Sequence, residues 1–413
     1  MTSCIATIVS ANYLAYARVL VESVQQRDPA WAVKVLVVDR ATPEIREAVR
    51  LSGLDVTFAE ELGLPDFEAL AFKYELVEFN TALKPTFLKR LFASGCERVA
   101  YLDPDIRLFA PLTPVSNALQ RHQIVLTPHA LAPAMDGLRP SDIDFLRNGA
   151  YNLGFIALAR GADSAAMLDW WEQRCLSYGF SDLGFGTFVD QKWIDLVPSY
   201  FDSVEVLRDR TCNVAYWNLH ERRITSAGPA PTVDGAPLSF FHFSGVKADK
   251  PGELSRHQTR HRLQPGTPLA ALVADYCSEL LRLGHANYSR FAYTFGSFDN
   301  GTRITRLMRR ASCIGAPPAT PFAAGGELHR HFEKEGWVTG GAPFKPPVTN
   351  TLDFDATAKP VVLANKGVRV LARIIGIERV DALLRYAGFL ARESNYARVL
   401  LRQPFDFVHR DKR

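Results

Sequence analysis

The sequence lacks the short motifs that would assign a chemistry at once. It contains no Gly-x-Gly-x-x-Gly, no Gly-x-x-x-x-Gly-Lys-Ser/Thr and no Gly-x-Ser-x-Gly segment. Dinucleotide-binding loops, P-loops and α/β-hydrolase nucleophiles are therefore not indicated. There is also no Cys-x-x-Cys pair and no histidine spacing typical of zinc sites. The six cysteines are scattered, so we expect free buried thiols in a reducing compartment.

Targeting and membrane-spanning signals are absent as well. The N-terminus has no basic segment and no cleavage site, so it does not resemble a signal peptide. No apolar run approaches the ~20 residues that span a bilayer. The net charge of +4 is too small to argue for a nucleic-acid partner. We expect a cytoplasmic protein that does not bind nucleic acid.

The first half of the chain alternates between strand and helix patterns. The expected strands and helices are Cys4–Val9, Tyr13–Gln25, Val33–Val38, Pro43–Leu51, Leu54–Phe58, Ala82–Ser94, Val99–Leu102, Ile124–Thr127, Asn152–Ala159, Ser164–Tyr178 and Leu238–His242. Apolar strands separated by helices are typical of a mostly parallel sheet covered on both faces. The sequence therefore predicts an α/β domain over residues 1–250.

Residues 251–413 no longer alternate between strand and helix patterns and are predicted to be mainly helical. Residues 251–313 are helical in pattern and rich in arginine, and we interpret the Arg-His pairs at 256–262 as a solvated helix face. Residues 315–351 contain 12 Gly and Pro, too many for regular elements. Residues 361–403 return to amphipathic helix.

The most informative segment is residues 98–109, in which Asp103 and Asp105 directly follow a short apolar strand. Ligands of open α/β sheets bind beyond the carboxyl ends of the strands. Two carboxylates at i and i+2 can bind one hard cation and the phosphates that it carries. Asp-Pro-Asp is also good turn chemistry. The segment alone leaves a metal site and a turn open.

Four other segments accompany this one in a recognisable order. The five are Ser10-Ala11-Asn12-Tyr13, Asp103-Pro104-Asp105, Tyr151-Asn152-Leu153-Gly154-Phe155, Phe188 to Trp193, and Phe240 to Lys247. Together they resemble the retaining glycosyltransferases of the GT-A fold, and most of all glycosyltransferase family 8, the glycogenin and lipopolysaccharide galactosyltransferase type. The resemblance covers about residues 4–250. It implies a Rossmann-like, mostly parallel sheet between helices.

The resemblance implies a metal site and a diphosphate site. Asp103 and Asp105 match the family's Asp-x-Asp, and His242 matches the third ligand of Mn²⁺ or Mg²⁺. A core histidine among aromatic residues is the alternative for His242. Gly245 would let the backbone approach the phosphates, and Lys247 would bind them. Lys247 comes one residue early for the family's lysine, whereas Lys250 comes two residues late.

The same resemblance places other residues around the donor. Asn152 and Gly154 match an Asn-x-Gly strand near the donor sugar, and Asp190 and Gln191 match the pair at the reacting carbon. A strand-end turn residue and a helix N-terminal acid are the alternatives for Asn152 and Asp190.

Three residues near the N-terminus and one lysine complete the implied donor site. Ser10, Asn12 and Tyr13 match the nucleotide-binding start, although relatives often have an acid where Ser10 stands. Lys84 stands near a basic residue that relatives place over the donor, and a helix surface position explains it equally well.

The predicted function is a metal-dependent glycosyltransferase. It would move a hexose from a UDP-sugar to a glycan or lipid-linked saccharide with retention of anomeric configuration. An inverting GT-A enzyme with Asp190 or Asp195 as general base is one alternative. A non-catalytic scaffold with the same fold is another.

The C-terminal segment carries a strong basic bias. Residues 359–413 hold twelve Lys or Arg against five acids, an excess of +7 in a chain whose total is +4. Basic residues beside an apolar stripe suit a helix on an anionic membrane surface. This predicts peripheral contact with the inner face of a membrane. Packing of the stripe onto the catalytic domain or a second subunit, as in a homo-oligomer, is the alternative.

Overall fold

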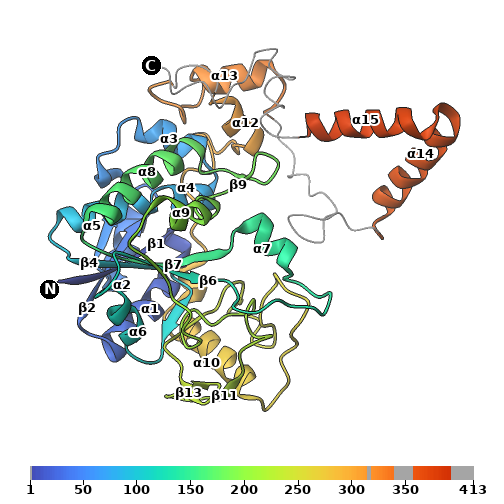
Figure 1. The fold of residues 1–413 in the computed structure, drawn as a ribbon. Helices are drawn as coiled ribbons and strands as arrows, with labels where there is room; N and C mark the ends of the chain where they lie inside the picture. Colours follow the sequence, from blue (N-terminus) through green and yellow to red (C-terminus); the bar gives the residue numbers. More distant parts are fainter. Residues whose placement is uncertain (1, 314–317, 339–356, 392–413) are drawn as a thin grey trace. The chain divides into compact units, whose positions relative to one another are not determined.

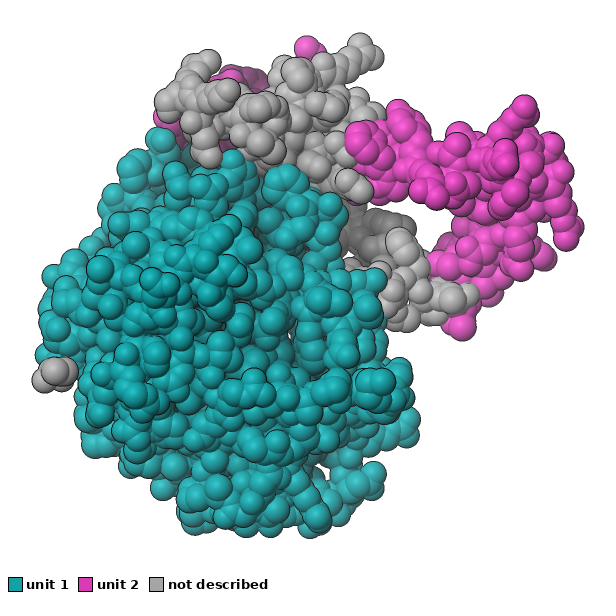
Figure 2. All heavy atoms as spheres, viewed as in Figure 1, with its two compact units in different colours: residues 1–296 teal, residues 297–413 magenta. Residues whose placement is uncertain are grey.

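The computed structural model describes residues 2–313, 318–338 and 357–391. The chain divides into two compact units, residues 1–296 and 297–413 (Figure 2). The domain boundary at residue 250 stays a prediction. Among the described residues, no helix has the length and apolar character needed to cross a membrane.

A seven-stranded sheet forms the centre of the first unit. Its strands, in spatial order, are β10 (Val204–Val206), β6 (Ile124–Pro128), β7 (Tyr151–Ala159), β4 (Arg98–Leu102), β1 (Ser3–Val9), β2 (Trp31–Val37) and β3 (Val56–Phe58). β7 runs antiparallel to β4 and β6, and the remaining pairings are parallel. The predicted α/β class with a mostly parallel sheet is confirmed.

Helices cover both faces of this sheet, which explains why its strands are apolar throughout. Residues Cys4 to Val9 of β1 are at most 2% exposed. One face carries α4 (Leu76–Ala82), α5 (Lys84–Ala93) and α8 (Ala162–Tyr178), and the other carries α1 (Leu14–Arg27), α2 (Pro43–Ser52) and α6 (Thr113–Ala118) (Figure 1). A strand that is covered on both faces has no side exposed to water, so its sequence does not need to alternate between polar and apolar residues.

The remaining elements of the first unit connect or flank these layers. They are α3 (Phe67–Lys73), α7 (Asp142–Asn148), α9 (Val197–Tyr200), α10 (Pro268–Arg282), α11 (His285–Tyr288), β5 (Ile106–Leu108), β8 (Ser181–Asp182), β9 (Thr187–Phe188), β11 (Ile224–Ser226), β12 (Thr232–Val233), β13 (Ala236–Pro237) and β14 (Phe240–His242), with 3₁₀ turns at Ala11–Tyr13, Ala59–Leu62 and Lys192–Leu196.

The strand predicted at Leu238–His242 exists as β14, but it lies outside the central sheet. It pairs antiparallel with β5, so that His242 lies opposite Ile106 and Phe240 opposite Leu108. β5 begins directly after Asp105. This pairing brings residue 242 beside the Asp-Pro-Asp turn.

The helical pattern predicted for residues 251–313 is wrong over 251–267, which contains no helix or strand. Pro251, Gly252, Pro265 and Gly266 break the backbone periodicity there. Helices begin only with α10, whose Leu272 and Tyr276 pack into the core that contains Val9 and Leu14. The Arg-His pairs at 256–262 are therefore not a helix face.

The second unit contains four helices among its described residues. These are α12 (Arg306–Ala311), α13 (Glu327–Lys334), α14 (Lys359–Ile375) and α15 (Ile377–Leu390). α13 corrects the expectation that 315–351 holds no regular element. It fits between Gly326 and Gly336, so the glycines border the helix and do not interrupt it. Residues 392–403 of the predicted C-terminal helix lie outside the described residues.

The cysteine prediction is wrong for two of the six residues. Cys4 on β1 and Cys96, just before β4, form a disulfide. Because β1 and β4 are parallel neighbours, the two Cα atoms lie 6.1 Å apart although 92 residues separate them. Cys175, Cys212, Cys277 and Cys313 keep their thiol groups, and all of them except Cys313 are buried, as predicted. The disulfide removes the sequence argument for a reducing compartment.

Candidate active site

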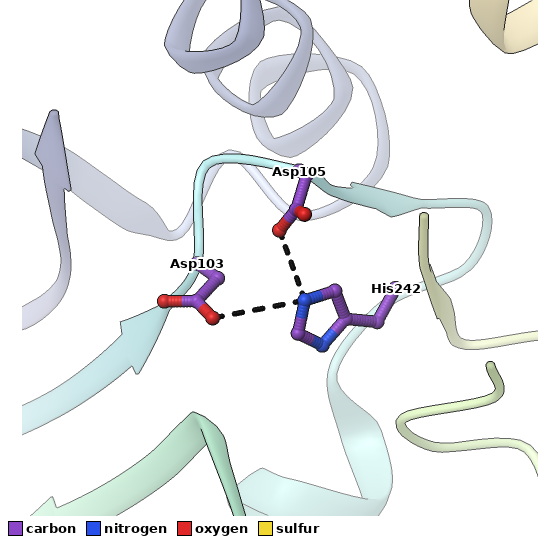
Figure 3. A group of neighbouring side chains, drawn as sticks. All are labelled: Asp103, Asp105 and His242. Atoms are coloured by element: carbon purple, nitrogen blue, oxygen red, sulfur yellow. Dashed lines mark ion pairs between the residues drawn. The ribbon is translucent and has the colours of Figure 1, made fainter. Parts of the chain in front are cut away.

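Three side chains that could bind one metal ion meet at the carboxyl end of β4 (Figure 3). Nε2 of His242 lies 2.9 Å from Oδ1 of Asp105 and 3.6 Å from Oδ2 of Asp103. The three ligand atoms all lie within 4.8 Å of one another. No second group of this kind occurs in the part of the chain that the structure describes. The two predicted carboxylates and the predicted histidine are thus brought together.

Backbone hydrogen bonds fix the three residues from neighbouring strands. The N–H of Asp103 donates to the carbonyl oxygen of Gly154 on β7, at 2.8 Å. The N–H of Ile106 donates to the carbonyl of Asp103, which closes the Asp-Pro-Asp turn, and the N–H of Phe243 donates to the carbonyl of Asp105. The segment is therefore a turn, and the turn is what directs both carboxylates toward His242.

Burial and charge shift the pKa values of the cluster. Burial raises the pKa of Asp103, while Lys84 and His242 act to lower it in part. Burial acts to lower the pKa of His242, but the neighbouring Asp105 and Asp103 carboxylates raise it overall. The hydroxyl of Tyr101 donates to Oδ1 of Asp103 at 2.7 Å. The two carboxylates therefore stabilise positive charge on the His242 ring.

Gly154 is required by the close approach of β7 to the cluster. A Cβ atom at this position would lie 2.3 Å from Cε1 of His242 and 2.8 Å from Oδ2 of Asp103. Those distances are far below a van der Waals contact. The predicted Asn-x-Gly strand thus has a steric explanation for its glycine, independent of any donor sugar.

Lys84 and Asp190 form a buried ion pair beside the cluster. Nζ of Lys84 lies 2.6 Å from Oδ2 of Asp190, and both side chains are 2% exposed. The same ammonium donates to the carbonyl oxygen of Leu153 and lies 4.0 Å from the ring centroid of Tyr101. Burial raises the pKa of Asp190, and Lys84 opposes that shift. The alternative of an exposed helix-surface position for Lys84 is wrong.

Gln191 and Asp195 have their polar atoms engaged within the protein. Gln191 accepts from the N–H of Leu153 at 3.0 Å and donates to the carbonyl of Asn148 at 2.9 Å. Asp195 accepts from the N–H of Ala150 at 2.8 Å and pairs with Lys192 at 2.7 Å. Both residues hold the start of β7 in place.

The predicted nucleotide-binding start is a short turn after β1. Oγ of Ser10 donates to Oδ1 of Asn12 at 2.5 Å, and Tyr13 is 40% exposed with its ring stacked on Tyr16. Burial, followed by the Asp105 carboxylate, raises the pKa of Tyr13. The phenol therefore lies within electrostatic reach of the metal cluster.

Asp39 supports this turn and was not among the predicted site residues. Its Oδ2 accepts from the N–H of Ala11 at 2.7 Å, and its Oδ1 accepts from the N–H and hydroxyl of Thr294. Asp39 is 1% exposed, because it lies at the carboxyl end of β2 against the end of β1. Asp39 directly follows an apolar run in the sequence, and this pattern could have identified it as a polar residue at a strand end.

The two lysines after His242 differ in their partners. Lys247 is exposed, and no ion pair to it occurs among the described residues. Lys250 pairs with Glu253 at 2.9 Å. Gly245 has φ +77°, and a Cβ there would lie 2.5 Å from Oγ of Ser255. Only a glycine allows that turn, which leads the chain from His242 to Lys247.

The arginines and histidines of 256–262 have specific contacts. Nε of Arg256 donates to Nε2 of His257 at 3.1 Å, and the His257 ring lies against Gly245. Arg260 binds both carboxylate oxygens of Asp136 at 2.7 and 2.9 Å. This segment therefore joins the loop after β6 to the turn after β14.

Three buried residues behind His242 were also missed by sequence reasoning. They are His129, Asn213 and Trp217, which contact Asn152 or the His242 ring. His129 follows β6 as Asp103 follows β4, so a polar residue at a strand end was its signal. Asn213 lies in irregular backbone, and nothing in the sequence pattern marks it.

No family model matches this chain. It is 27% identical over 265 residues to the uncharacterized protein YfnF of Bacillus subtilis (strain 168), covering 63% of this chain and 87% of that protein. It is 24% identical over 245 residues to the uncharacterized protein YfnD of the same organism, covering 58% and 76%.

Solved structures with a partly similar fold include glycosyltransferases. The galactosyltransferase LgtC, solved with donor and acceptor sugar analogs, aligns with a TM-score of 0.41 and 16% identity, over 68% of this chain and 96% of LgtC. The glycosyltransferase GlyE of Streptococcus pneumoniae TIGR4 gives 0.40 and 14%, over 72% and 67%. At such TM-scores no activity can be transferred, so the function is inferred from the side chains of this chain.

We predict that Lys84→Met destabilises the fold by about 3–5 kcal/mol, because it leaves the Asp190 carboxylate buried without its cation. Unfolding in urea at pH 7 measures this loss. The loss should shrink as the pH is lowered toward about 5, because a carboxyl group whose pKa is raised in the folded state binds protons more readily there than in the unfolded chain.

Lys89→Met is the matched control, because Lys89 pairs with Asp169 and Glu172 at a side-chain exposure of 36%. Its cost should stay within about 1 kcal/mol. Equal losses for the two variants would contradict the assignment of Lys84 as the charge that compensates Asp190.

Proposed function

We propose that this chain is a metal-dependent glycosyltransferase that uses a nucleoside-diphosphate sugar as donor. The single observation that carries the proposal is the Asp103, Asp105 and His242 cluster beyond the carboxyl end of β4. Ligands of open α/β sheets bind at that edge. In our proposal the donor is a UDP-hexose, and the acceptor is a glycan or a lipid-linked saccharide.

The charges around the cluster fit a divalent cation. Asp103, Asp105 and Asp190 contribute three negative charges when ionised, and Lys84 contributes one positive charge, which leaves a local charge of −2. Two carboxylates and one imidazole suit Mn²⁺, and Mg²⁺ is the alternative. When bound, such an ion would supply positive charge to a departing diphosphate.

In our proposal, different residues of this chain bind the base and the diphosphate of the donor. Tyr13, exposed and stacked on Tyr16, would lie against the base, with Ser10 and Asn12 shaping the turn. Lys247 would place its unpaired ammonium on the diphosphate, which Gly245 allows to approach the backbone. Lysine without an acidic partner is suited to that role.

Asp190 and Gln191 are the proposed catalytic residues, at the sugar end of the donor. Asp190 would stabilise positive charge at the anomeric carbon as that carbon loses its leaving group. Gln191 already binds the backbone on both sides of its amide, so contact with the donor would require it to exchange one of those hydrogen bonds. Gly154 leaves the space beside His242 and Asp103 free of a side chain.

Retention is favoured over inversion by the partners of the nearby acids. An inverting enzyme needs a carboxylate that is free to accept a proton from the acceptor. Asp190 is paired with Lys84, and Asp195 is paired with Lys192 and bound to the N–H of Ala150. NMR of the product's anomeric proton distinguishes the two outcomes, and an inverted product would overturn this part of the proposal.

The alternative of a non-catalytic scaffold predicts a different response to metal. A scaffold should release no UDP from common UDP-sugars with Mn²⁺, with or without acceptors. Release that depends on Mn²⁺ supports the enzyme.

We expect Asp105→Asn to lower kcat/KM at least about 100-fold while the fold is retained. The amide keeps the shape but lacks the charge, and metal electrostatics contribute several kcal/mol, of which about 1.4 kcal/mol is tenfold in rate. Mn²⁺-dependent UDP release measures the loss, and circular dichroism checks the fold. Asp136→Asn, which removes an acid outside the cluster, is the control. Wild-type turnover and Mn²⁺ affinity in Asp105→Asn would contradict the metal site.

Lys247→Ala should weaken donor use about 10- to 100-fold, as expected for the loss of a hydrogen bond to a charged group. Lys250→Ala should have little effect, because Lys250 already binds Glu253. Both variants are compared by kcat/KM for the donor. A larger loss in Lys250→Ala would assign the diphosphate to that lysine.

We also propose that α14 and α15 contact an anionic membrane surface at its inner face, near a lipid-linked acceptor. Their exposed apolar residues are Val362, Leu363, Val370, Leu371, Ile374, Ile377, Leu383, Leu384, Tyr386 and Phe389. Basic residues such as Lys366, Arg369 and Arg373 lie among them.

The full chain is expected to sediment with vesicles of phosphatidylserine and phosphatidylcholine at low salt, and a chain ending at residue 355 is not. Salt should weaken the binding, because the attraction to anionic lipid is screened. Equal sedimentation of the two chains would contradict the membrane proposal. Concentration-dependent self-association of the full chain alone, without sedimentation, would assign the helices to an oligomer.

A further inference from the structure

A chain of buried side-chain hydrogen bonds lies behind the metal cluster. It runs from His242 to Asn152 on β7, and from there to His129 and Asn213. All four residues are at most 7% exposed, so no bulk water competes for their polar atoms. Their hydrogen bonds must therefore be mutually consistent.

Asn213 fixes one end of this network. Its Nδ2 donates to Oγ1 of Thr127 at 2.8 Å and to Oδ1 of Asn152 at 3.1 Å. Asn213 has φ +52°, a left-handed conformation that asparagine tolerates better than most residues. Asn218 donates to the carbonyls of His129 and Asn213 at 3.1 and 3.0 Å, which ties this backbone to β6.

His129 fixes the other end. Nδ2 of Asn152 donates to Nε2 of His129 at 3.3 Å, so that nitrogen must carry a lone pair. Burial lowers the pKa of His129 to about 4, which keeps the ring neutral. The ring is stacked on Phe145 at 5.3 Å between centroids and cannot turn freely.

Both ends orient the Asn152 amide in the same sense. With its NH₂ group on His129, its Oδ1 faces Nδ1 of His242 at 3.3 Å. A carbonyl oxygen only accepts, so Nδ1 of His242 must carry the hydrogen. With the hydrogen on Nδ1 held by Asn152, Nε2, the atom that faces Asp103 and Asp105, is the nitrogen that can give up its proton and bind a metal ion with its lone pair.

We propose that Asn152, held by His129 and Asn213, is a positioning residue that fixes the ring tautomer of His242 with Nε2 as the metal-binding atom. The inference rests on the metal site of the proposed function. It replaces a direct donor-sugar contact for Asn152 with a role through His242. Removing a partner that fixes the tautomer of a ligating histidine typically lowers metal affinity about 10- to 100-fold.

Two substitutions of Asn152 separate this role from simple packing. Asn152→Asp keeps an oxygen that accepts from Nδ1 of His242, whereas Asn152→Leu keeps the size and removes the acceptor. Mn²⁺ affinity, measured by electron paramagnetic resonance of the free ion, should fall about 10- to 100-fold in Asn152→Leu and be largely restored in Asn152→Asp. Equal affinity in Asn152→Leu and wild type would overturn the proposal.

His129→Phe tests the indirect partner. It retains a ring against Phe145 but removes the acceptor for Asn152, so Mn²⁺ affinity should fall although residue 129 is not a ligand. His220→Phe is the matched control, because His220 contacts the carbonyl of Ala132 and is outside the network. Its affinity should match wild type. Similar losses for both histidine variants would mean a general packing effect and overturn the role of His129.

The tautomer can be observed without any substrate. In the chain loaded with diamagnetic Mg²⁺, long-range ¹H–¹⁵N NMR should find His242 protonated on Nδ1 and bare on Nε2. A proton on Nε2 with Mg²⁺ bound, or a ring that is bare on Nδ1, would overturn the proposal. Mn²⁺ binding that follows these expectations, without transfer from any donor, would overturn the proposed function and leave this inference standing. Failure of the wild type to bind Mn²⁺ or Mg²⁺ overturns both.

Discussion

The antiparallel pairing of β5 with β14 is the contact on which the candidate site depends. β5 starts directly after Asp105, and His242 is the last residue of β14, opposite Ile106. The two segments are more than 130 residues apart in the chain, and the strand pairing alone puts them within ligand distance. Gly154 then lets β7 approach from the side, since any Cβ there would overlap His242. Three strands thus determine one cluster of three side chains.

Buried charge is the second constraint. Lys84 at the start of α5 compensates Asp190 and also opposes the rise that burial causes in the pKa of Asp103, so one ammonium acts on two carboxylates. The excess of negative charge that remains is what a divalent ion would neutralise. An unneutralised group of buried carboxylates is costly in a low-dielectric interior. The local stability of this region and the metal affinity that we propose for it therefore depend on the same excess of negative charge.

The polar residues behind His242 extend this arrangement away from the cluster. Asn218 connects His129 to Asn213 through the backbone, because its side-chain amide donates to the carbonyl oxygens of both residues. Because each is buried, each hydrogen bond restricts the next one, and the orientation of one amide is transmitted to the ring of His242. The loops beyond the strand ends therefore have a fixed structure at the site.

The sequence by itself determined the α/β class and the main strands of the first half, although it did not mark α3, α4, α6, α7 and β5. A local signal marked Asp103 and Asp105, because an apolar run followed by acids indicates a strand end. His242 was assigned by the resemblance to a known family, and the structure brings it beside the two acids. Sequence reasoning failed where the outcome depends on distant neighbours. Cys4 and Cys96 bond only because β1 and β4 are parallel neighbours, and Lys84 is buried only because Asp190 lies opposite it. Likewise, α13 forms within a Gly- and Pro-rich segment because the glycines fall at its ends. Only the tertiary structure decided that Asn152 faces His242, with His129 and Asn213 as partners, since hydrogen bonds between residues some 23 to 90 positions apart leave no periodic trace in the sequence.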